Sequence, residues 1–419
     1  MTARGQFWFL PPEPTGFNAT TLGAVKDAYG DNSVVIGHNA SAPFTPGPTQ
    51  SGVRPGVNNT VVIGTNALAR QTTPGAIVIG YNASTSQYDP GMAVGSPSVI
   101  IGNGANAFQS GVVIGGDAVG NTFSTTIGAG ANGQNYCVAI GNGAKTGSSN
   151  GATVIGNLAG TGVASGSSII IGAGAYISAG AAAIAIGSSS SNATANGTGT
   201  FCSGNFGVAI GCSAGALKTT AAAGGVALGG SENVAVTAGQ TAVAIGYNAQ
   251  GTNQGAVAIG PWAGTDFQGE IAFGTGRWTA NGDFKLSMVP LRVQTTDATV
   301  TEMTTGKGDQ GAVAASAIVL TNNSTYIFDV DIVARKSTTG TDYSAWNLKG
   351  CINREANAAS TALVGSVTKT LIGQTAGAST WDVSMTADTT NGRPNISVTG
   401  QAGTTIRWVG NVRMTKVQG

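Results

Sequence analysis

Charged side chains are scarce in this 419-residue chain, where only 9% of residues are Asp, Glu, Lys or Arg. Ordinary soluble domains carry about 25%. The 19 basic residues nearly balance the 18 acidic ones, so the chain lacks the basic excess of a protein that binds nucleic acid by charge. A single histidine, His38, is present. With so few titratable groups we expect no metal site, no cofactor, no catalytic residues and no enzymatic activity.

One pair of carboxylates has a spacing that needs explanation. Asp329 and Asp331 stand two residues apart, so they lie on the same face if this segment is a strand. Two carboxylates can act together in glycoside hydrolysis. A solvated strand face explains the same spacing, and we favour that interpretation.

Long hydrophobic runs and patterned cysteines are also missing. No run of about 18 apolar residues suggests a membrane helix, and the apolar run Phe7–Leu10 is shorter than the core of a signal peptide. We therefore expect synthesis in a cytoplasm, with no signal peptide and no membrane insertion. The cysteines have no metal-site spacing. Free buried thiols are the favoured state, although Cys202 and Cys212 could pair.

What the sequence does contain is a repeat. A short apolar strand ending in glycine recurs as VVIG at Val34–Gly37, VIIG at Val99–Gly102, IIIG at Ile169–Gly172 and VAIG at Val257–Gly260, among others. Several of the closing glycines are 13 residues apart. This period is too short for repeats that contain a helix. Each unit is therefore predicted to be one coil of a parallel β-solenoid whose backbone pairs with the coils before and after it.

The strands predict how the coils are packed. Alternate side chains of a strand face opposite ways, and we expect the first and third residues of each VAIG strand to point into the coil. The middle residues would then form an apolar outer stripe, which implies an obligate homo-oligomer. The candidate interface residues are Val35, Val62, Val113, Ile170, Ala209 and Ala244.

The repeat resembles the head repeat of trimeric autotransporter adhesins (YadA-like) over roughly residues 31–274. The resemblance rests on Val/Ile-Ala-Ile-Gly and on the Asn-Ala or Gly-Ala that follows it, as at Asn248-Ala249. It implies a homotrimer with a left-handed parallel β-roll. The adhesins also have a signal peptide, a coiled-coil stalk and a membrane barrel, none of which is recognised here. The same repeat occurs in bacteriophage tail fibres, which need no export signal.

After the repeat, charged residues become regular and the strands become amphipathic. Apolar residues alternate with polar ones at Tyr326–Ile332, Trp346–Asn353, Trp381–Met385 and Ile406–Met414. This pattern predicts an antiparallel, jelly-roll-like β-sandwich. Three segments resemble the C-terminal domain of phage tail fibres and tailspikes: WNLKGCINREANAASTALVGS (Trp346–Ser366), WDVSMTADTTNG (Trp381–Gly392) and IRWVGNVRMTKV (Ile406–Val417).

These observations predict an all-β chain with three parts: an attachment or capping segment at 1–30, a β-roll shaft at 31–282 and a β-sandwich at 283–419. The resemblance implies a structural tail fibre, assembled in the host cytoplasm and built into the virion tail. The aromatic, proline-containing N-terminal segment is a candidate for docking on a baseplate or tail protein. A bacterial surface adhesin is the alternative, and a tailspike polysaccharide depolymerase is a more remote one.

Host recognition, of a surface glycan or protein, has two candidate locations. The first comprises loops of the end domain around Thr338–Tyr343, Arg354–Ser360 and Thr389–Arg393, with Tyr343, Arg354 and Arg393 as candidate receptor-binding residues. The second comprises insertions that interrupt the shaft at Pro43–Pro55, Thr85–Pro97 and Ser188–Asn205.

Overall fold

The computed structural model describes most of the repeat and of the end domain. The described residues are 20–23, 27–28, 32–42, 59–69, 75–85, 97–108, 110–148, 150–161, 166–177, 181–188, 200–211, 220–230, 236–306, 316–337 and 341–419. The chain forms two compact units, Met1–Ser188 with Asn192–Asn196 and Ser189–Ser191 with Gly197–Gly419. Most of the N-terminal segment and most of each shaft insertion lie outside the described residues.

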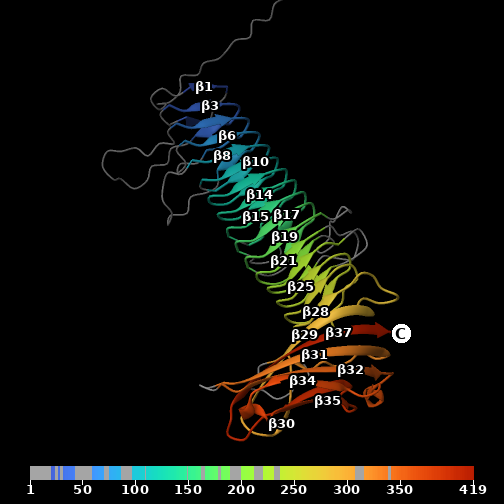
Figure 1. Cartoon of the computed structure of the whole chain (residues 1–419). Coiled ribbons are helices and arrows are strands. Elements are labelled where there is room, and N and C mark those ends of the chain that lie inside the picture. The colour runs from blue at the N-terminus through green and yellow to red at the C-terminus, as the bar shows by residue number, and fades with distance from the viewer. Residues whose placement is uncertain are drawn as a thin grey trace, which may run out of the picture. The chain divides into compact units, whose positions relative to one another are not determined.

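The first unit is a parallel β-solenoid, coloured blue to green in Figure 1. Its three-residue strands pair in register, so that Val112 lies opposite Val99 on one side and Thr125 on the other. These strands are β1 (Thr20–Leu22), β3 (Val34–Ile36), β5 (Val61–Ile63), β6 (Ile77–Ile79), β8 (Val99–Ile101), β10 (Val112–Ile114), β12 (Thr125–Ile127), β14 (Val138–Ile140), β15 (Thr153–Ile155), β17 (Ile169–Ile171) and β19 (Ile184–Ile186).

Two-residue strands close most of these coils on a second side. They are β2 (Asp27–Ala28), β4 (Ser41–Ala42), β7 (Ser84–Thr85), β9 (Asn106–Ala107), β11 (Val119–Gly120), β13 (Asn132–Gly133), β16 (Gly160–Thr161) and β18 (Tyr176–Ile177).

Glycine forms the corner because the coils approach too closely there for any other residue. Gly115 has φ +143°, and a Cβ atom at this position would overlap the carbonyl group of Gly128 in the next coil. Two residues further on, the chain again takes a positive φ, as at Asn39 (52°) and Asp117 (53°). Asn, Asp and Gly tolerate this left-handed conformation best, which explains their recurrence at the corner.

The faces of the strands are the reverse of the prediction. The middle residue of each three-residue strand from β3 to β28 (Ile271–Phe273) is fully buried within its own chain, and this includes all six candidate interface residues, Val35, Val62, Val113, Ile170, Ala209 and Ala244. They pack inside the coil with the alanines that follow the corners, such as Ala40 and Ala118. A coil this short encloses a narrow interior, which suits one middle residue and small alanines. The larger first and third residues therefore lie outside.

The second unit begins with further coils of the same kind and ends in antiparallel sheets. The coil strands are β20 (Phe201–Cys202), β21 (Val208–Ile210), β22 (Thr220–Ala221), β23 (Val226–Leu228), β24 (Thr237–Ala238), β25 (Val243–Ile245), β26 (Gln250–Gly251), β27 (Val257–Ile259) and β28 (Ile271–Phe273). The last of them, β28, pairs antiparallel with β29, Ile271 opposite Met288.

The end domain consists of two antiparallel sheets over one core. The larger sheet has the order β29 (Phe284–Thr295), β37 (Ile406–Gln418), β31 (Ser324–Lys336), β32 (Tyr343–Arg354) and β34 (Thr368–Gln374), with β33 (Ala362–Leu363) beside β32. The smaller has β30 (Val300–Glu302), β36 (Arg393–Thr399) and β35 (Asp382–Asp388). Two short 3-10 turns follow β32 and β34, η2 (Ala358–Ser360) and η3 (Ala376–Ala378).

Three tryptophans fill the centre of this core. The ring of Trp408 lies 5.7 Å from that of Trp346 and 5.9 Å from that of Trp381. Residues of both sheets, such as Val330 and Val398, belong to the same buried cluster. The prediction of an all-β chain, a solenoid followed by antiparallel sheets, is confirmed, and the described residues contain no α-helix.

Two further expectations concern the cysteines and membrane helices. Cys137 and Cys202 are buried thiols that form no disulfide, Cys351 is likewise a thiol, and Cys212 lies outside the described residues. No helix in the described ranges is long and apolar enough to cross a membrane.

Candidate functional site

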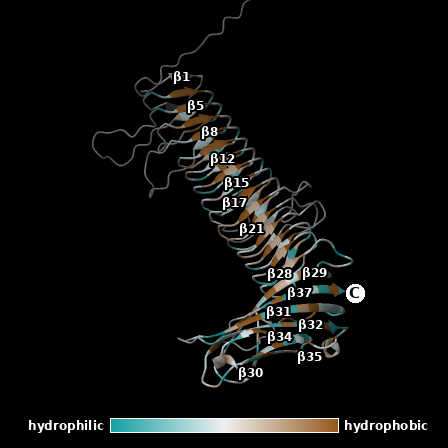
Figure 2. Ribbon diagram, in the orientation of Figure 1, coloured by the Kyte–Doolittle hydropathy of each residue, from teal (hydrophilic) through white to brown (hydrophobic). Residues whose placement is uncertain are grey.

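The first candidate surface is a pair of apolar rows on the outside of the solenoid. We call the first and third residues of the three-residue strands the outer rows. They include exposed isoleucines in the first unit, such as Ile101 (37%), Ile169 (39%) and Ile171 (38%). In the second unit they include Ile210, Ile259 and Phe273. Figure 2 shows hydrophobic colour along these strands.

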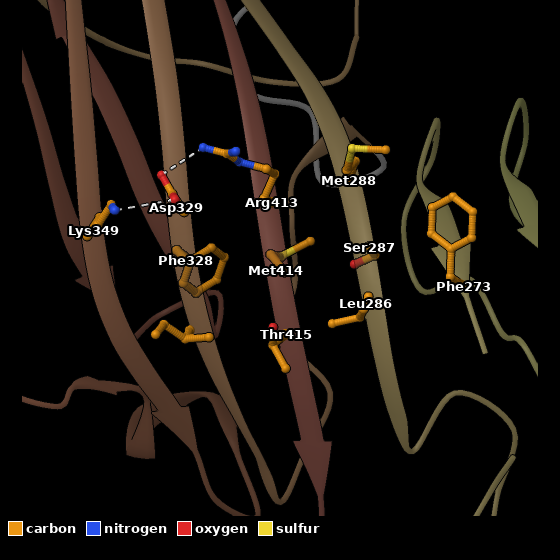
Figure 3. Close-up of a pocket in the computed structure, with 11 residues that line it drawn as sticks. Phe273, Leu286, Ser287, Met288, Phe328, Asp329, Lys349, Arg413, Met414 and Thr415 are labelled. Carbon is orange, nitrogen blue, oxygen red and sulfur yellow. Dashed lines mark ion pairs between the residues drawn. The ribbon is translucent and has the colours of Figure 1, made fainter. Parts of the chain in front are cut away.

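The rows continue onto the end domain within the second unit. Phe273 lies opposite Leu286 of β29, and Leu286 and Ile327 are each 58% exposed. Together with Met288 and Met414 these side chains line a groove of about 510 Å³. Figure 3 shows this groove, with Phe273 on one side and an ion-paired group on the other. Exposed apolar side chains that form a continuous surface are characteristic of interaction surfaces.

The ion-paired group contains the two carboxylates singled out in the sequence. The guanidinium of Arg413 lies 3.2 Å from Asp329 and 2.9 Å from Asp331, and Asn347 donates hydrogen bonds to both. The hydrogen bond from Asn347, together with the cations Arg413 and Lys349, lowers the pKa of Asp329 in spite of some desolvation. Both carboxylates are thus ion-paired on a strand face. This agrees with the interpretation of the pair as part of a solvated strand face.

The three candidate receptor-binding residues have different environments. Tyr343 is 54% exposed at the start of β32. Arg354 instead points into the domain, where its Nη1 donates to the carbonyl oxygens of Leu320 (2.6 Å) and Gly392 (3.2 Å). Arg354 therefore links two segments of the domain, and its role in receptor binding stays a prediction. Of the loop around Thr338–Tyr343, residues 338–340 lie outside the described residues.

Arg393 also links segments of the domain, and it holds two carboxylates together. It is 9% exposed and lies 2.9 Å from both Glu302 and Asp388. Burial raises the pKa of Glu302, against the attraction of Arg393 and with a contribution from the charge of Asp388. Burial acts in the same direction on Asp388, but hydrogen bonds from Asn391, Arg393 and Thr390 lower its pKa to about 2.

This arrangement was not anticipated from the sequence. Glu302 is 91 residues from Arg393, so no local spacing joins them. Two neighbouring carboxylates with opposite pKa shifts are a pattern found in acid–base active sites. In the described part of the chain no group of acidic, histidine or cysteine side chains is arranged to hold a metal ion.

The chain matches no protein-family model and no curated protein. Among solved structures it is similar to tailspike proteins of Acinetobacter phages, at low identity and with poor superposition. A tailspike of the Acinetobacter baumannii bacteriophage Fri1 is 10% identical, with a TM-score of 0.22 over 93% of this chain and 71% of that one. The tailspike of Acinetobacter phage vB_ApiP_P1 is 8% identical, with a TM-score of 0.22 over 92% and 82%. The tailspike of Acinetobacter baumannii phage AM24 is 9% identical, with a TM-score of 0.21 over 96% and 68%.

The comparison corrects one expectation. The Fri1 tailspike is described as a capsular polysaccharide depolymerase, which contradicts the expectation that a chain of this kind is not an enzyme. We withdraw that expectation. Its physical basis was weak, because a small number of carboxylates is sufficient for glycoside hydrolysis.

Proposed function

We propose that this chain is a homotrimeric phage tail protein that attaches the virion to the host cell surface. The outer rows are the observation that carries the proposal. They place Val and Ile side chains on the outside of coil after coil, as Ile169 and Ile171 do in β17. Three copies of the chain packed side by side as a left-handed β-roll would cover these rows.

The proposal assigns a separate role to each of the three parts of the chain. Residues 1–30 dock on a baseplate or other tail protein, 31–282 form the shaft, and 283–419 form an end domain that contacts the host. Of the residues suggested for recognition, Tyr343 is the main candidate, because an exposed phenol ring can stack on a sugar. The assembled protein belongs to the virion tail and is produced in the host cytoplasm.

The proposal has a direct test. Sedimentation of the purified protein gives its mass, which should correspond to three chains of 41.2 kDa. Host cells incubated with the protein should then adsorb fewer virions. Antibodies against the protein should label virion tails in electron micrographs; labelling of bacterial surfaces instead would favour the adhesin alternative.

A second candidate function is cleavage of the host polysaccharide, and the carboxylates around Arg393 favour it. Glu302, with its raised pKa, would act as the general acid and Asp388 as the carboxylate that remains ionised. The test is the release of reducing ends from host polysaccharide by the purified protein. Glu302→Gln should abolish it, whereas Asp329→Asn, a control on the other sheet, should leave it unchanged. Equal activity of both variants would contradict this assignment.

A further inference from the structure

An aromatic cluster with an arginine lies on the last coils of the second unit. Tyr247 and Trp262 follow the corner glycines Gly246 and Gly260, and their rings meet edge to face with centroids 4.6 Å apart. The guanidinium carbon of Arg277 lies 4.3 Å from the centroid of the Trp262 ring. Tyr247 is 42% exposed, and Arg277 is also exposed. The cluster is therefore open to solvent.

The backbone at Trp262 is unusual for so large a residue. Its φ is +59°, a conformation that bulky residues rarely adopt. Asn, Asp or Gly occupies this corner position in most other coils, as at Asn39, Gly104 and Asp117, and Leu158 is the other bulky residue found there among the described coils. The indole ring of Trp262 therefore projects from a corner where most coils carry a short side chain.

The segment that carries Arg277 is held rigidly. One carboxylate oxygen of Asp283 accepts hydrogen bonds from the backbone N–H groups of Trp278 (2.9 Å), Thr279 (2.6 Å) and Ala280 (2.9 Å). The neighbouring Trp278 packs against Phe284, with ring centroids 5.0 Å apart. Ligand binding here would cost little ordering of the backbone, because the turn is already fixed.

The charge of Arg277 is not neutralised by its surroundings. Within the ranges that the structure covers, no carboxylate lies at ion-pair distance from it, and its described contact is with Trp262. The nearby carboxylates are otherwise engaged: Asp283 with backbone N–H groups, and Asp266 and Glu270 with Lys285. A guanidinium stacked on a ring keeps its in-plane N–H donors available for a planar anion.

We propose that Arg277, Trp262 and Tyr247 form a binding site for a carboxylated pyranose of the host surface polysaccharide. The guanidinium of Arg277 binds the sugar carboxylate with two parallel hydrogen bonds. The two rings contact the apolar face of the sugar. This inference rests on the proposed function, since it names the class of glycan that the attachment protein would recognise.

The test uses the full-length protein on an array of purified bacterial surface polysaccharides. Each polysaccharide that contains a uronic acid is printed beside its carboxyl-reduced, neutral form. The variants are Arg277→Gln and, as a control with the same loss of charge, Arg335→Gln at an exposed position of β31. Trp262→Ala tests the ring contact. Melting temperature and sedimentation confirm that each variant is folded and assembled.

The expected result is binding to at least one carboxylated polysaccharide that falls about tenfold on carboxyl reduction and about tenfold in Arg277→Gln, a loss typical of one charge-assisted interaction. Arg335→Gln should bind like the wild type. The proposal is overturned if no carboxylated polysaccharide is bound, if the neutral forms bind equally, or if Arg277→Gln binds normally. It is also overturned if Trp262→Ala changes the sedimentation but not the glycan binding, since the cluster is then a subunit contact.

Failure of this site can be told apart from failure of the proposed function. If the wild-type protein and Arg277→Gln block virion adsorption equally, the attachment function stands and the site falls. If the wild-type protein blocks no adsorption at all, the attachment function falls, and the array alone decides on the sugar site.

Discussion

Lys285 and Glu270 form an ion pair with no access to solvent: the Nζ and Oε1 atoms are 2.7 Å apart, and both side chains are fully buried. Lys285 also lies 2.9 Å from Asp266, which in turn lies 2.9 Å from Lys416. The two acidic residues belong to the last coil, whereas Lys285 is in β29 and Lys416 in β37. The cluster thus connects the end of the solenoid with the larger antiparallel sheet.

Removing one charge from this cluster should be strongly destabilising. Lys285→Met leaves Glu270 buried without its counter-ion, and breaking a buried pair in this way costs about 3–5 kcal/mol. Lys369→Met is the matched control, because its pair with Asp382 is exposed and such pairs contribute about 0–1 kcal/mol. The measurement is the free energy of unfolding in denaturant. Equal losses in the two variants would contradict the assigned role of the cluster.

The same cluster predicts a pH dependence. Although burial acts to raise the pKa of Asp266, the cations Lys285 and Lys416 lower it below its ordinary value of 3.8. Its contribution to stability is therefore present above about pH 4 and lost as the pH falls through the folded pKa. Burial acts to lower the pKa of Lys285, but Glu270 and Asp266 raise it above 10.5.

The contribution of Lys285 is accordingly present below pH 10.5 and lost as the pH rises through the raised pKa. Melting temperatures measured from about pH 2 to about pH 12 should be constant between roughly pH 4 and roughly pH 10, near the ordinary pKa values of aspartate and lysine. They should fall on both sides of this range. In Lys285→Met the alkaline loss should be smaller. An unchanged alkaline slope in that variant would argue against this origin.

Two glycines of neighbouring corners should respond differently to alanine. Gly115→Ala places a Cβ atom against the Gly128 carbonyl group, whereas a Cβ atom on Gly130 meets nothing within 4 Å. Gly130 has φ +63°, so alanine there costs only the left-handed conformation, about 1–2 kcal/mol. Gly115→Ala should lower the melting temperature far more and open the local backbone to hydrogen exchange. Similar behaviour of the two variants would show that the corners can separate.

Aspartate on the two faces of one strand separates folding from assembly. Ile170 is fully buried inside the coil, while Ile171 is 38% exposed on the outer rows. Ile170→Asp should prevent folding, because burying an unpaired charge costs on the order of several kcal/mol. Ile171→Asp should keep the β-rich circular dichroism spectrum and sediment as a smaller species than the wild type. A normal trimer of Ile171→Asp would exclude the outer rows as the subunit contact.

The sequence predicted the solenoid well because its repeat reports backbone pairing directly. Strand positions, corner glycines and the alternation of the end-domain strands all follow from local pattern. The choice of inner face did not follow, since alternation defines two faces without saying which is buried. A volume argument would have decided it: alanine occupies the middle position at Ala139, Ala185 and Ala209, and small residues suit a narrow interior.

The site residues were harder to predict because they depend on contacts between distant segments. Arg354 and Arg393 were selected as charged loop residues, yet both bind partners far away in sequence, such as Leu320 and Glu302. Arg277 and Trp262 drew no attention as part of the shaft. Only the folded chain brings the turn after β28 against the corner that carries Trp262.

The uniformity of the coils has a consequence for assembly fidelity. A shift by one coil would place Val112 beside Ile77 or Val138 in place of Val99 or Thr125, and Gly115 again beside a corner glycine, so the ladder itself scarcely penalises a register error. The antiparallel junction of β28 with β29, and the ion cluster next to it, have no counterpart among the described coils. Correct alignment of the repeats with one another must therefore be dictated from this non-repetitive end.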